Sequence, residues 1–522
     1  MFTKFRYLTI ALLTLFAIIA ILLIVSKRSH IAKDKIIARV GDEIITVDEF
    51  RYSYEFGPAP LKHGPNPRRT YLDYMIREKL LAEEGYAKGY HKSSYVTRRM
   101  RHRRYLDLLE AFYTKYVHGR VKIPEDSIKE AVKKSTVTFR LRIWPTKDLD
   151  DAEKAYLQAK NIGLADYIKK QLAKADMPIA RERNFVTGWI DYLEIRPEIL
   201  NGIKDLEVGT VSKPIPFENG YALFEVVDIQ RSGIREQDLE RGVKRKRIED
   251  RLHNIEADKI VHNLMDSLLT PMNVRVKGRV VAQLAPALYE WINKGLPFGP
   301  PLLDTFKNPD TLKGYLKSIN DLLDETLVTY DGKKKTVRDY LRYMDYFRKE
   351  LKRRPNEEEF EKVLVTEIGR MIKNDTFVEI AARDGFEKSE KIQQDLSLWQ
   401  DKWTYEAFRN DLVSDIAVSD SELVDYFKHH WRELPVADVD STRFESYRIE
   451  VYNEVKHKKY LARLEEEVAQ IKEQYPVWIN EAVLDTLNLH DEGLSRNISL
   501  LVINRFSRKP VVPTVDLNWI AF

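Results

Sequence analysis

The chain has 522 residues, of which 43% are hydrophobic and 32% are charged, and it contains no cysteine. This length and composition predict a globular protein of about three domains and exclude a disordered chain. The 86 Lys and Arg residues nearly balance the 81 Asp and Glu residues, so the net charge of +5 gives little reason to expect nucleic-acid binding. The absence of cysteine excludes disulfides, thiolate metal sites and a cysteine nucleophile, and it suits an oxidising compartment.

Residues 1–28 are predicted to form a short cytoplasmic stub and one transmembrane helix. Sixteen of the eighteen residues from Leu8 to Val25 are apolar, which is long enough to cross a bilayer core. The small residues of a cleavage site are missing after this span, so an uncleaved anchor is favoured over a signal peptide. Positive charges flank the span on both sides, and we expect the short N-terminus inside and the body outside.

The body after this anchor consists of two related halves. Residues Val40–Phe50 predict a short strand or turn and then a helix with Thr46 as its cap, and residues 330–340 repeat this pattern. An amphipathic helix that ends near Gly89 is mirrored by one that ends near Gly385, and both glycines are typical of helix C-caps. These matches predict a duplicated helical module.

The spacing of the next helix supports the duplication. A new helix begins near Ile123 in the first half and near Val418 in the second, at nearly equal distances from Gly89 and Gly385. Chance similarity between two helical stretches is a poor explanation for this agreement.

The halves then differ, because only the first continues into a β-containing segment, over about residues 137–228. The second passes almost directly into a long helix, about 444–474, which corresponds to the helix at about 236–268 in the first half. We therefore predict an α+β protein in which one of two helical modules carries an inserted α/β domain. The predicted domains after the anchor are 29–134 (module 1, first part), 135–232 (inserted domain), 233–293 (returning helix of module 1), 294–324 (linker), 325–486 (module 2 without an insert) and 487–522 (C-terminal tail).

The inserted segment contains the most informative motif of the chain. Residues Leu206–Pro214 contain a turn at Gly209 and a Ser-x-Pro step, and residues Asn219–Val227 form a second turn and an alternating strand. This stretch closely resembles the C-terminal hairpin of parvulin-type peptidylprolyl isomerases. The resemblance implies a parvulin-like fold that uses no cofactor and no metal.

The parvulin family usually has two histidines in its site, and this chain has neither. The first falls on Leu141 or Arg142, and the second, after the Gly-Tyr pair of the last strand, falls on Ala222. The catalytic residues are therefore unknown. The candidate substrate-binding residues are Arg142, Trp189, Pro214 and Tyr221, against the alternative of an exposed arginine and a core tryptophan without a role in binding.

The helical modules resemble periplasmic chaperones of the SurA and PpiD kind, through the pattern that begins at Ala38 and the helix at Leu80–Tyr90. This resemblance implies a periplasmic chaperone or foldase, anchored in the inner membrane, that binds unfolded secreted or outer-membrane proteins, with no nucleic acid as partner. An active parvulin-type isomerase is the alternative.

Three other features of the sequence allow an interpretation, two of them with an alternative. The histidines in charged helices, among them His118 and His253, are expected to be isolated surface residues. Most helical aromatic residues are expected in the core, with a minority that could line a client cradle. The end of the chain, residues 517–522, could add as a strand to a partner or dock on its own protein.

Overall fold

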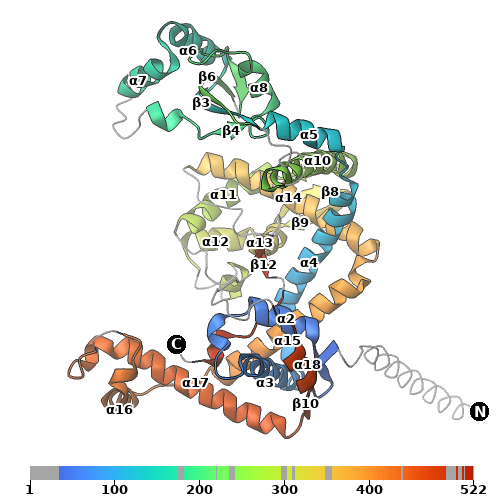
Figure 1. Ribbon diagram of the computed structural model, residues 1–522, viewed down its shortest axis with the longest axis vertical. Helices are drawn as coiled ribbons and strands as arrows, with labels where there is room; N and C mark the ends of the chain where they lie inside the picture. The colour runs from blue at the N-terminus through green and yellow to red at the C-terminus, as the bar shows by residue number, and fades with distance from the viewer. Residues whose placement is uncertain are drawn as a thin grey trace, which may run out of the picture. The chain divides into compact units, whose positions relative to one another are not determined.

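The computed structural model describes residues 35–174, 182–218, 220–233, 242–294, 302–307, 312–346, 356–436, 439–489, 501–503, 508–510 and 512–520 (Figure 1). The chain divides into two compact units, one with residues 1–112, 276–328 and 334–522, and one with residues 113–275 and 329–333. Both units combine helices with small antiparallel sheets, so the α+β class is confirmed. The predicted anchor lies outside the described residues, and none of the helices within them is long and apolar enough to span a membrane.

The same series of elements occurs twice along the chain. The hairpin β1 (Ile36–Val40) and β2 (Glu43–Thr46) leads into α2 (Val47–Phe56), and β8 (Thr326–Tyr330) and β9 (Lys333–Thr336) lead into α13 (Val337–Tyr346) in the same way. The side chain of Thr46 accepts a hydrogen bond from the backbone N–H of Glu49, and Thr336 does the same for Asp339. Both helices therefore begin with the predicted hydroxyl cap.

Two long helical pairs follow the hairpins. In the first, α3 (Pro67–Ala87) is joined to α4 (Ser94–Tyr116), and in the second, α14 (Glu357–Arg383) is joined to α15 (Glu390–Leu412). Gly89 and Gly385 occupy the two turns with φ of 83° and 81°, a left-handed conformation that glycine adopts without the Cβ clash.

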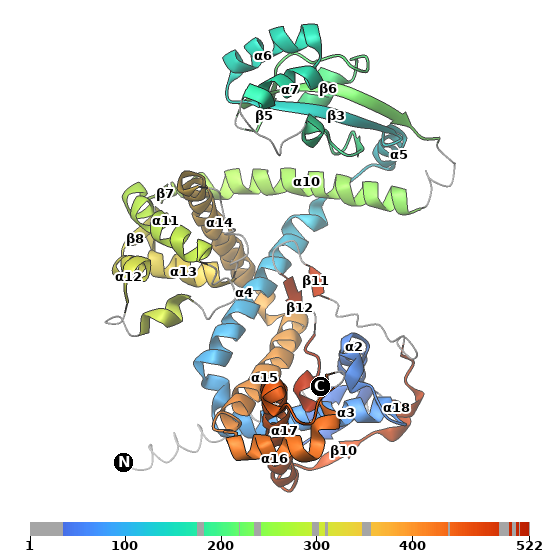
Figure 2. The same ribbon diagram turned by 90° about the vertical axis from the view of Figure 1, so that its left-hand side faces the viewer.

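The two copies interlock, which differs from the predicted separate modules at 29–134 with 233–293 and at 325–486. Helix α3 packs against α15 and α17 (Arg448–Lys472), which belong to the second copy (Figure 2). Likewise, Phe112 of α4 stacks on Phe377 of α14, with ring centroids 4.1 Å apart. Strand β1 also pairs with β10 (Val477–Ile479), near the end of the chain. Hydrophobic periodicity indicates which face of a helix is buried but not which element packs against it, so the exchange could not be predicted.

When residues are matched by their distance along the chain from Gly89 in one copy and from Gly385 in the other, the interlocked helices are related by an approximate two-fold axis. Each copy contributes helices to two equivalent halves of this bundle, which we call lobes. Lys79 bonds Asp401 at 2.7 Å in one lobe, and Asp375 accepts a hydrogen bond from Tyr105 at 2.9 Å at the equivalent positions of the other. Arg103 and Trp399 occupy equivalent positions themselves and contact each other, with the guanidinium carbon 4.9 Å from the ring centroid. The approximate two-fold axis therefore passes between these two side chains.

The described part of the first unit also includes four more α-helices and two short strands. Lys277, just before α11, donates its backbone N–H to Leu327 of β8 at 2.8 Å. Helix α11 packs on α12 and α14, and α16 packs on α17. The bounds are α11 (Gly278–Asn293), α12 (Gly314–Asp321), α16 (Asp420–His430), α18 (Glu481–Thr486), β11 (Leu501–Ile503) and β12 (Arg508–Pro510).

The second unit is built around a four-stranded antiparallel sheet in the order β4-β3-β6-β5. Helices α6 and α7 cover one face of the sheet and α8 covers the other (Figure 1). Its elements are β3 (Val137–Thr146), α6 (Leu149–Ile162), α7 (Leu164–Lys174), β4 (Ile190–Asp191), α8 (Pro197–Ile203), β5 (Ile215–Phe217) and β6 (Gly220–Arg231).

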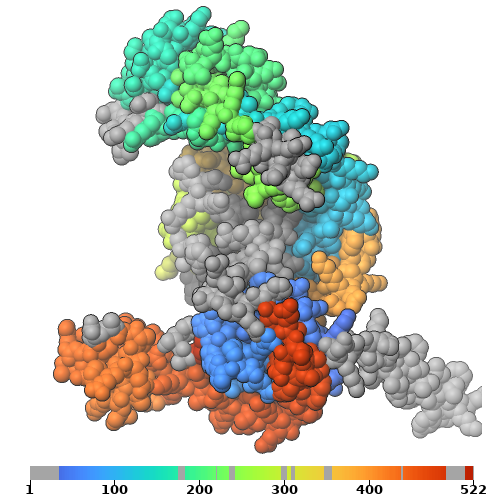
Figure 3. All heavy atoms as spheres, in the orientation of Figure 1, coloured from blue at the N-terminus to red at the C-terminus, as the bar shows by residue number. Residues whose placement is uncertain are grey.

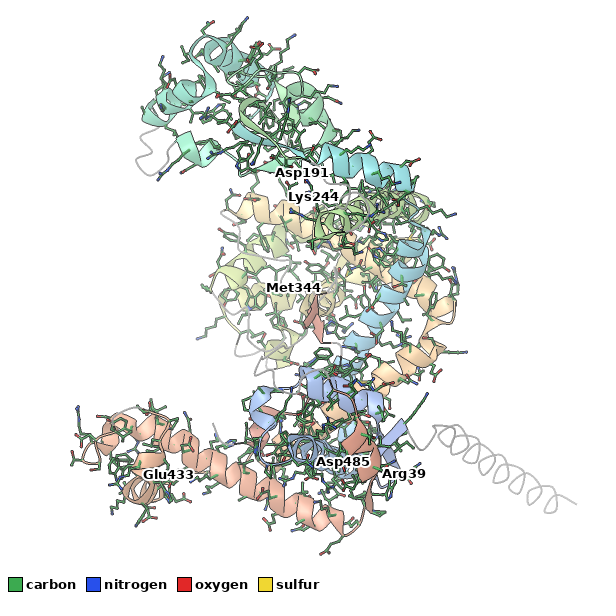
Figure 4. The ribbon with its side chains drawn as sticks, viewed as in Figure 1. Arg39, Asp191, Lys244, Met344, Glu433 and Asp485 are labelled. Carbon is green, nitrogen blue, oxygen red and sulfur yellow. The ribbon has the colours of Figure 1, made fainter. Side chains whose placement is uncertain are left out.

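Two more helices border this sheet, α5 (Glu125–Lys134) and α10 (Val243–Leu269). The short strand β7 (Arg275–Val276) belongs to a separate three-stranded sheet in the order β7-β8-β9. Ile128 and Val132 of α5 pack against Ile248 of α10. Asp191 of β4, which Figure 4 labels, accepts a hydrogen bond from Arg251 of α10 at 3.3 Å. Helix α10 therefore contacts α5 through apolar side chains and β4 through an ion pair.

Candidate functional site

The hairpin motif seen in the sequence docks on β6 through its backbone. Gly209 donates its N–H to the carbonyl of Val226 at 2.8 Å, and Ser212 donates its N–H to the carbonyl of Phe224 at 2.7 Å. The Ser212 hydroxyl accepts the N–H of Phe224 at 3.0 Å. These bonds explain the spacing between the turn, the Ser-x-Pro step and the last strand.

The turn into β6 requires glycine at position 220. A Cβ on Gly220 would lie 2.4 Å from the carbonyl oxygen of Thr146 and 2.7 Å from that of Lys147. Backbone atoms cannot move aside as a flexible side chain can, so the close approach excludes any larger residue.

The two positions at which the family usually has histidines share one face of the sheet. Leu141 of β3 and Ala222 of β6 are 1% and 0% exposed, and both pack with Ile199 and Ile203 of α8. Because successive side chains in a strand point to opposite faces, Arg142 points away from this cluster. Of the two candidates for the first position, Leu141 shares a face with Ala222 and Arg142 does not.

This face is a packed apolar core. Within the described residues from β3 to β6, the buried polar side chains are Ser212 and Glu225. The Ser212 hydroxyl is bound by backbone groups, and Glu225 lies on the other face. Leu141 and Ala222 cannot donate or accept a proton, so this face has neither of the imidazoles with which the family lines its proline pocket.

Arg142 is held in an ion pair on the opposite face. It stands directly across from Glu225 in the β3–β6 ladder, and the Nη1–Oε1 distance is 2.6 Å. The side chains are 14% and 10% exposed. The Nε of Arg142 and the Oε2 of Glu225 are buried without a hydrogen-bond partner in the described part of the chain. The reading of Arg142 as an exposed arginine is wrong, because the cross-strand carboxylate holds it inside.

The other candidate binding residues do not converge with Arg142. Trp189 precedes β4 at one edge of the sheet and is 43% exposed, so the reading of it as a core tryptophan is also wrong. Pro214 precedes β5 at the other edge, and Tyr221 pairs with Pro216 in the β5–β6 hairpin. The short strand β4 ends the sheet, which leaves Trp189 without a covering layer.

Two histidines that sequence reasoning treated as isolated surface residues form a pair. His118 and His253 lie with Nδ1 and Nε2 3.0 Å apart and with stacked rings. Their separation along the chain gave no signal for this contact. His102 differs too, since burial and then the neighbouring Arg103 lower the pKa of its imidazole to about 4. Among the described residues, no group of three or more His, Cys, Asp or Glu side chains could hold a metal ion.

Comparison with known proteins identifies the sheet domain. The family model described as a PPIC-type PPIASE domain matches residues 125–239. A search of the curated proteins gives no match.

Among solved structures, the chain is similar to the peptidylprolyl isomerase PrsA from Bacillus anthracis, with 14% identity, a TM-score of 0.20, and coverage of 38% of this chain and 96% of that one. It is also similar to one of the SurA-like chaperones PEB4 and Cj1289 from Campylobacter jejuni, with 17% identity, a TM-score of 0.21, and coverage of 45% and 97%. The family match confirms the parvulin resemblance of the inserted segment, which is similar to PPIC-type PPIase domains over residues 125–239.

Proposed function

We propose that this chain is a polypeptide-binding chaperone or foldase in which the PPIC-type domain binds clients without isomerising proline bonds. The observation that carries the proposal is the apolar core at Leu141 and Ala222. Isomerisation crosses a barrier of about 18–20 kcal/mol, and a catalyst must favour a twisted amide with a pocket and polar groups. The face at Leu141 and Ala222 supplies apolar packing and neither family histidine.

Exposed apolar side chains in the same unit support binding. Leu149 and Leu157 of α6 are 43% and 65% exposed, and Val208, in the loop that precedes β5, is 57% exposed. Together with Trp189 they offer apolar contacts that do not depend on a fixed client sequence, which suits the recognition of unfolded chains.

The proposed place of action is the periplasmic side of the inner membrane. The support is the sequence of residues 8–25, long and apolar enough for a single span, and the absence of cysteine. The proposed clients are unfolded secreted or outer-membrane proteins. Detection of the chain in the soluble rather than the membrane fraction, with its N-terminus cleaved, would contradict the anchor.

The test of client binding is suppression of aggregation. A chemically unfolded outer-membrane protein is diluted into buffer with increasing amounts of the purified chain, and light scattering is recorded. We expect scattering to fall as the chain approaches a stoichiometric ratio. Unchanged scattering with every client tried would overturn the proposal.

An active isomerase is the second candidate, and the intact hairpin framework of Gly209, Ser212 and Gly220 favours it. It predicts catalysis of cis/trans exchange in proline peptides with several different preceding residues. Absence of catalysis on all of them would remove this candidate.

A further inference from the structure

The tail segment, residues 512–520, packs on α3 and α15 of the first unit. Figure 3 shows another C-terminal part of the chain, orange-red, against the N-terminal elements, blue, in the region where Figure 1 labels α18. Val515 and Trp519 are 3% and 4% exposed and belong to the same hydrophobic core as Leu80 and Phe408. Of the two readings of the chain end, the structure shows residues 512–520 docked on their own protein.

The main chain of the tail segment is bound by side chains. The N–H of Val515 is directed at the hydroxyl of Tyr71 at 3.3 Å, and the N–H of Asp516 donates to the carboxylate of Glu78 at 2.7 Å. Lys402 holds the same Glu78 carboxylate at 2.7 Å. Backbone N–H groups are common to all residues except proline, so these two bonds accept an extended segment of almost any sequence.

Two side chains of the tail segment add specificity. Asp516 forms an ion pair with Arg409 of α15, and the two side chains are 17% and 11% exposed. Trp519 stacks between Tyr74 and Tyr405, with ring centroids 6.2 and 6.5 Å away. The site therefore recognises a carboxylate followed by an aromatic ring.

The tail segment does not fill its site completely. A cavity of about 40 Å³ remains beneath Pro513, Thr514 and Val515. The indole Nε1 of Trp519 is buried without a hydrogen-bond partner within the described residues. An unsatisfied group of this kind weakens the fit of the tail segment, so a segment with better matched polar groups can compete.

The other lobe of the approximate two-fold lacks these binding residues. Counting from Gly89 and Gly385, the position of Tyr71 is taken by Glu367, that of Glu78 by Asn374 and that of Tyr405 by Leu109. The helices interlock in both lobes although only one lobe has Tyr71, Glu78 and Tyr405. The packing of the helices therefore does not require these three side chains.

We propose that this groove, lined by Tyr71, Glu78, Tyr405 and Arg409, is a binding site for extended polypeptide segments. The segments it binds carry an acidic residue and, three positions later, an aromatic one, as Asp516 and Trp519 do. The tail segment occupies it as an internal ligand and leaves it when a client segment binds. This inference rests on the proposed function, because it names where part of an unfolded client is held and what regulates its access.

The experiment compares the full chain with its Asp516→Asn variant. The probe is reduced, carboxymethylated α-lactalbumin, a chain that stays unfolded in buffer, and affinity is measured by fluorescence anisotropy. Loss of the Arg409 ion pair weakens the tail segment and leaves α3 and α15 unchanged, so we expect client affinity to rise about tenfold. Unchanged or lower affinity, with the circular dichroism of the wild type, would overturn the inference.

A second measurement uses the chain that ends at residue 511 and a labelled peptide of residues 512–522. We expect the peptide to bind, a scrambled peptide not to bind, and Arg409→Gln to weaken binding about tenfold, whereas substitution of the exposed Arg383 of α14 by glutamine leaves it unchanged. Peptide binding that unlabelled α-lactalbumin fails to displace would also overturn the inference.

Failure of this inference can be told apart from failure of the proposed function. If the wild-type chain suppresses aggregation and the peptide does not compete with the client, the groove alone is refuted. If the chain holds no client in any assay, the proposed function fails, and the inference fails with it even where the peptide binds.

Discussion

Replacing Arg142 by methionine tests whether this residue supports the fold or contacts a client. Glu225 is 8% exposed, and in the variant its carboxylate loses the guanidinium that lies 2.6 Å away. Breaking a buried pair by removing one partner costs about 3–5 kcal/mol, because the remaining charge has no partner. We therefore expect a local loss of stability of this size in β3 and β6.

The double variant Arg142→Met with Glu225→Leu removes both charges. Apolar replacement of a buried ion pair is often neutral or stabilising, so the double variant should recover most of the loss. Arg140→Met is the matched control, since Arg140 is exposed on the same strand, and its effect should stay within about 0.5 kcal/mol.

The assay is hydrogen exchange of β3 and β6 peptides in the full chain, followed by mass spectrometry. At about 1.4 kcal/mol per factor of ten, Arg142→Met should speed exchange at least about a hundredfold. Client affinity should be unchanged in the double variant. Unchanged exchange together with weaker client binding would show that Arg142 is a binding residue and refute the structural reading.

Three further predictions concern other sites. Burial, followed by the nearby Glu43 carboxylate, raises the pKa of Glu83 from 4.5 to about 7. Because the folded state then holds the proton more tightly than the unfolded state, the stability of the fold decreases as the pH rises from about 4.5 to 7. Thermal melts of the Glu83→Gln variant should lose this dependence on pH. If the dependence persisted, the assignment to Glu83 would be wrong. Gly220→Ala should destabilise the sheet domain by more than about 2 kcal/mol in urea, whereas Gly188→Ala, with open space around its Cβ, should have little effect, and equal effects would contradict the steric argument. Ala222→His should cost about 1–3 kcal/mol through overpacking of a fully buried site and should not create isomerase activity; a stable variant with such activity would count against the packed core.

The sequence predicted features that depend on neighbouring residues. The caps at Thr46 and Thr336, the left-handed turns at Gly89 and Gly385 and the hairpin at Gly220 are encoded within a few residues, and the structure has each of them. The parvulin fold was recognised for the same reason, since its turn and alternating strand form one continuous motif.

Features that depend on distant partners were not predictable. The exchange of helices between the copies pairs α3 with α15, and nothing in the apolar stripe of either helix specifies the other. The burial of Arg142 likewise depends on Glu225, a distant residue that lies opposite it only once β3 and β6 have paired. The contact between His118 and His253 arises in the same way.

The most direct test of the central claim is the prolyl cis/trans relaxation rate of a short peptide and of a slowly refolding protein, with the purified chain added at increasing concentration. The packed core at Leu141 and Ala222 predicts no change in either rate, while aggregation of the refolding protein is suppressed. A rate that rises in proportion to the added chain would contradict the claim, because it would mean that the PPIC-type domain isomerises proline bonds without the two histidines.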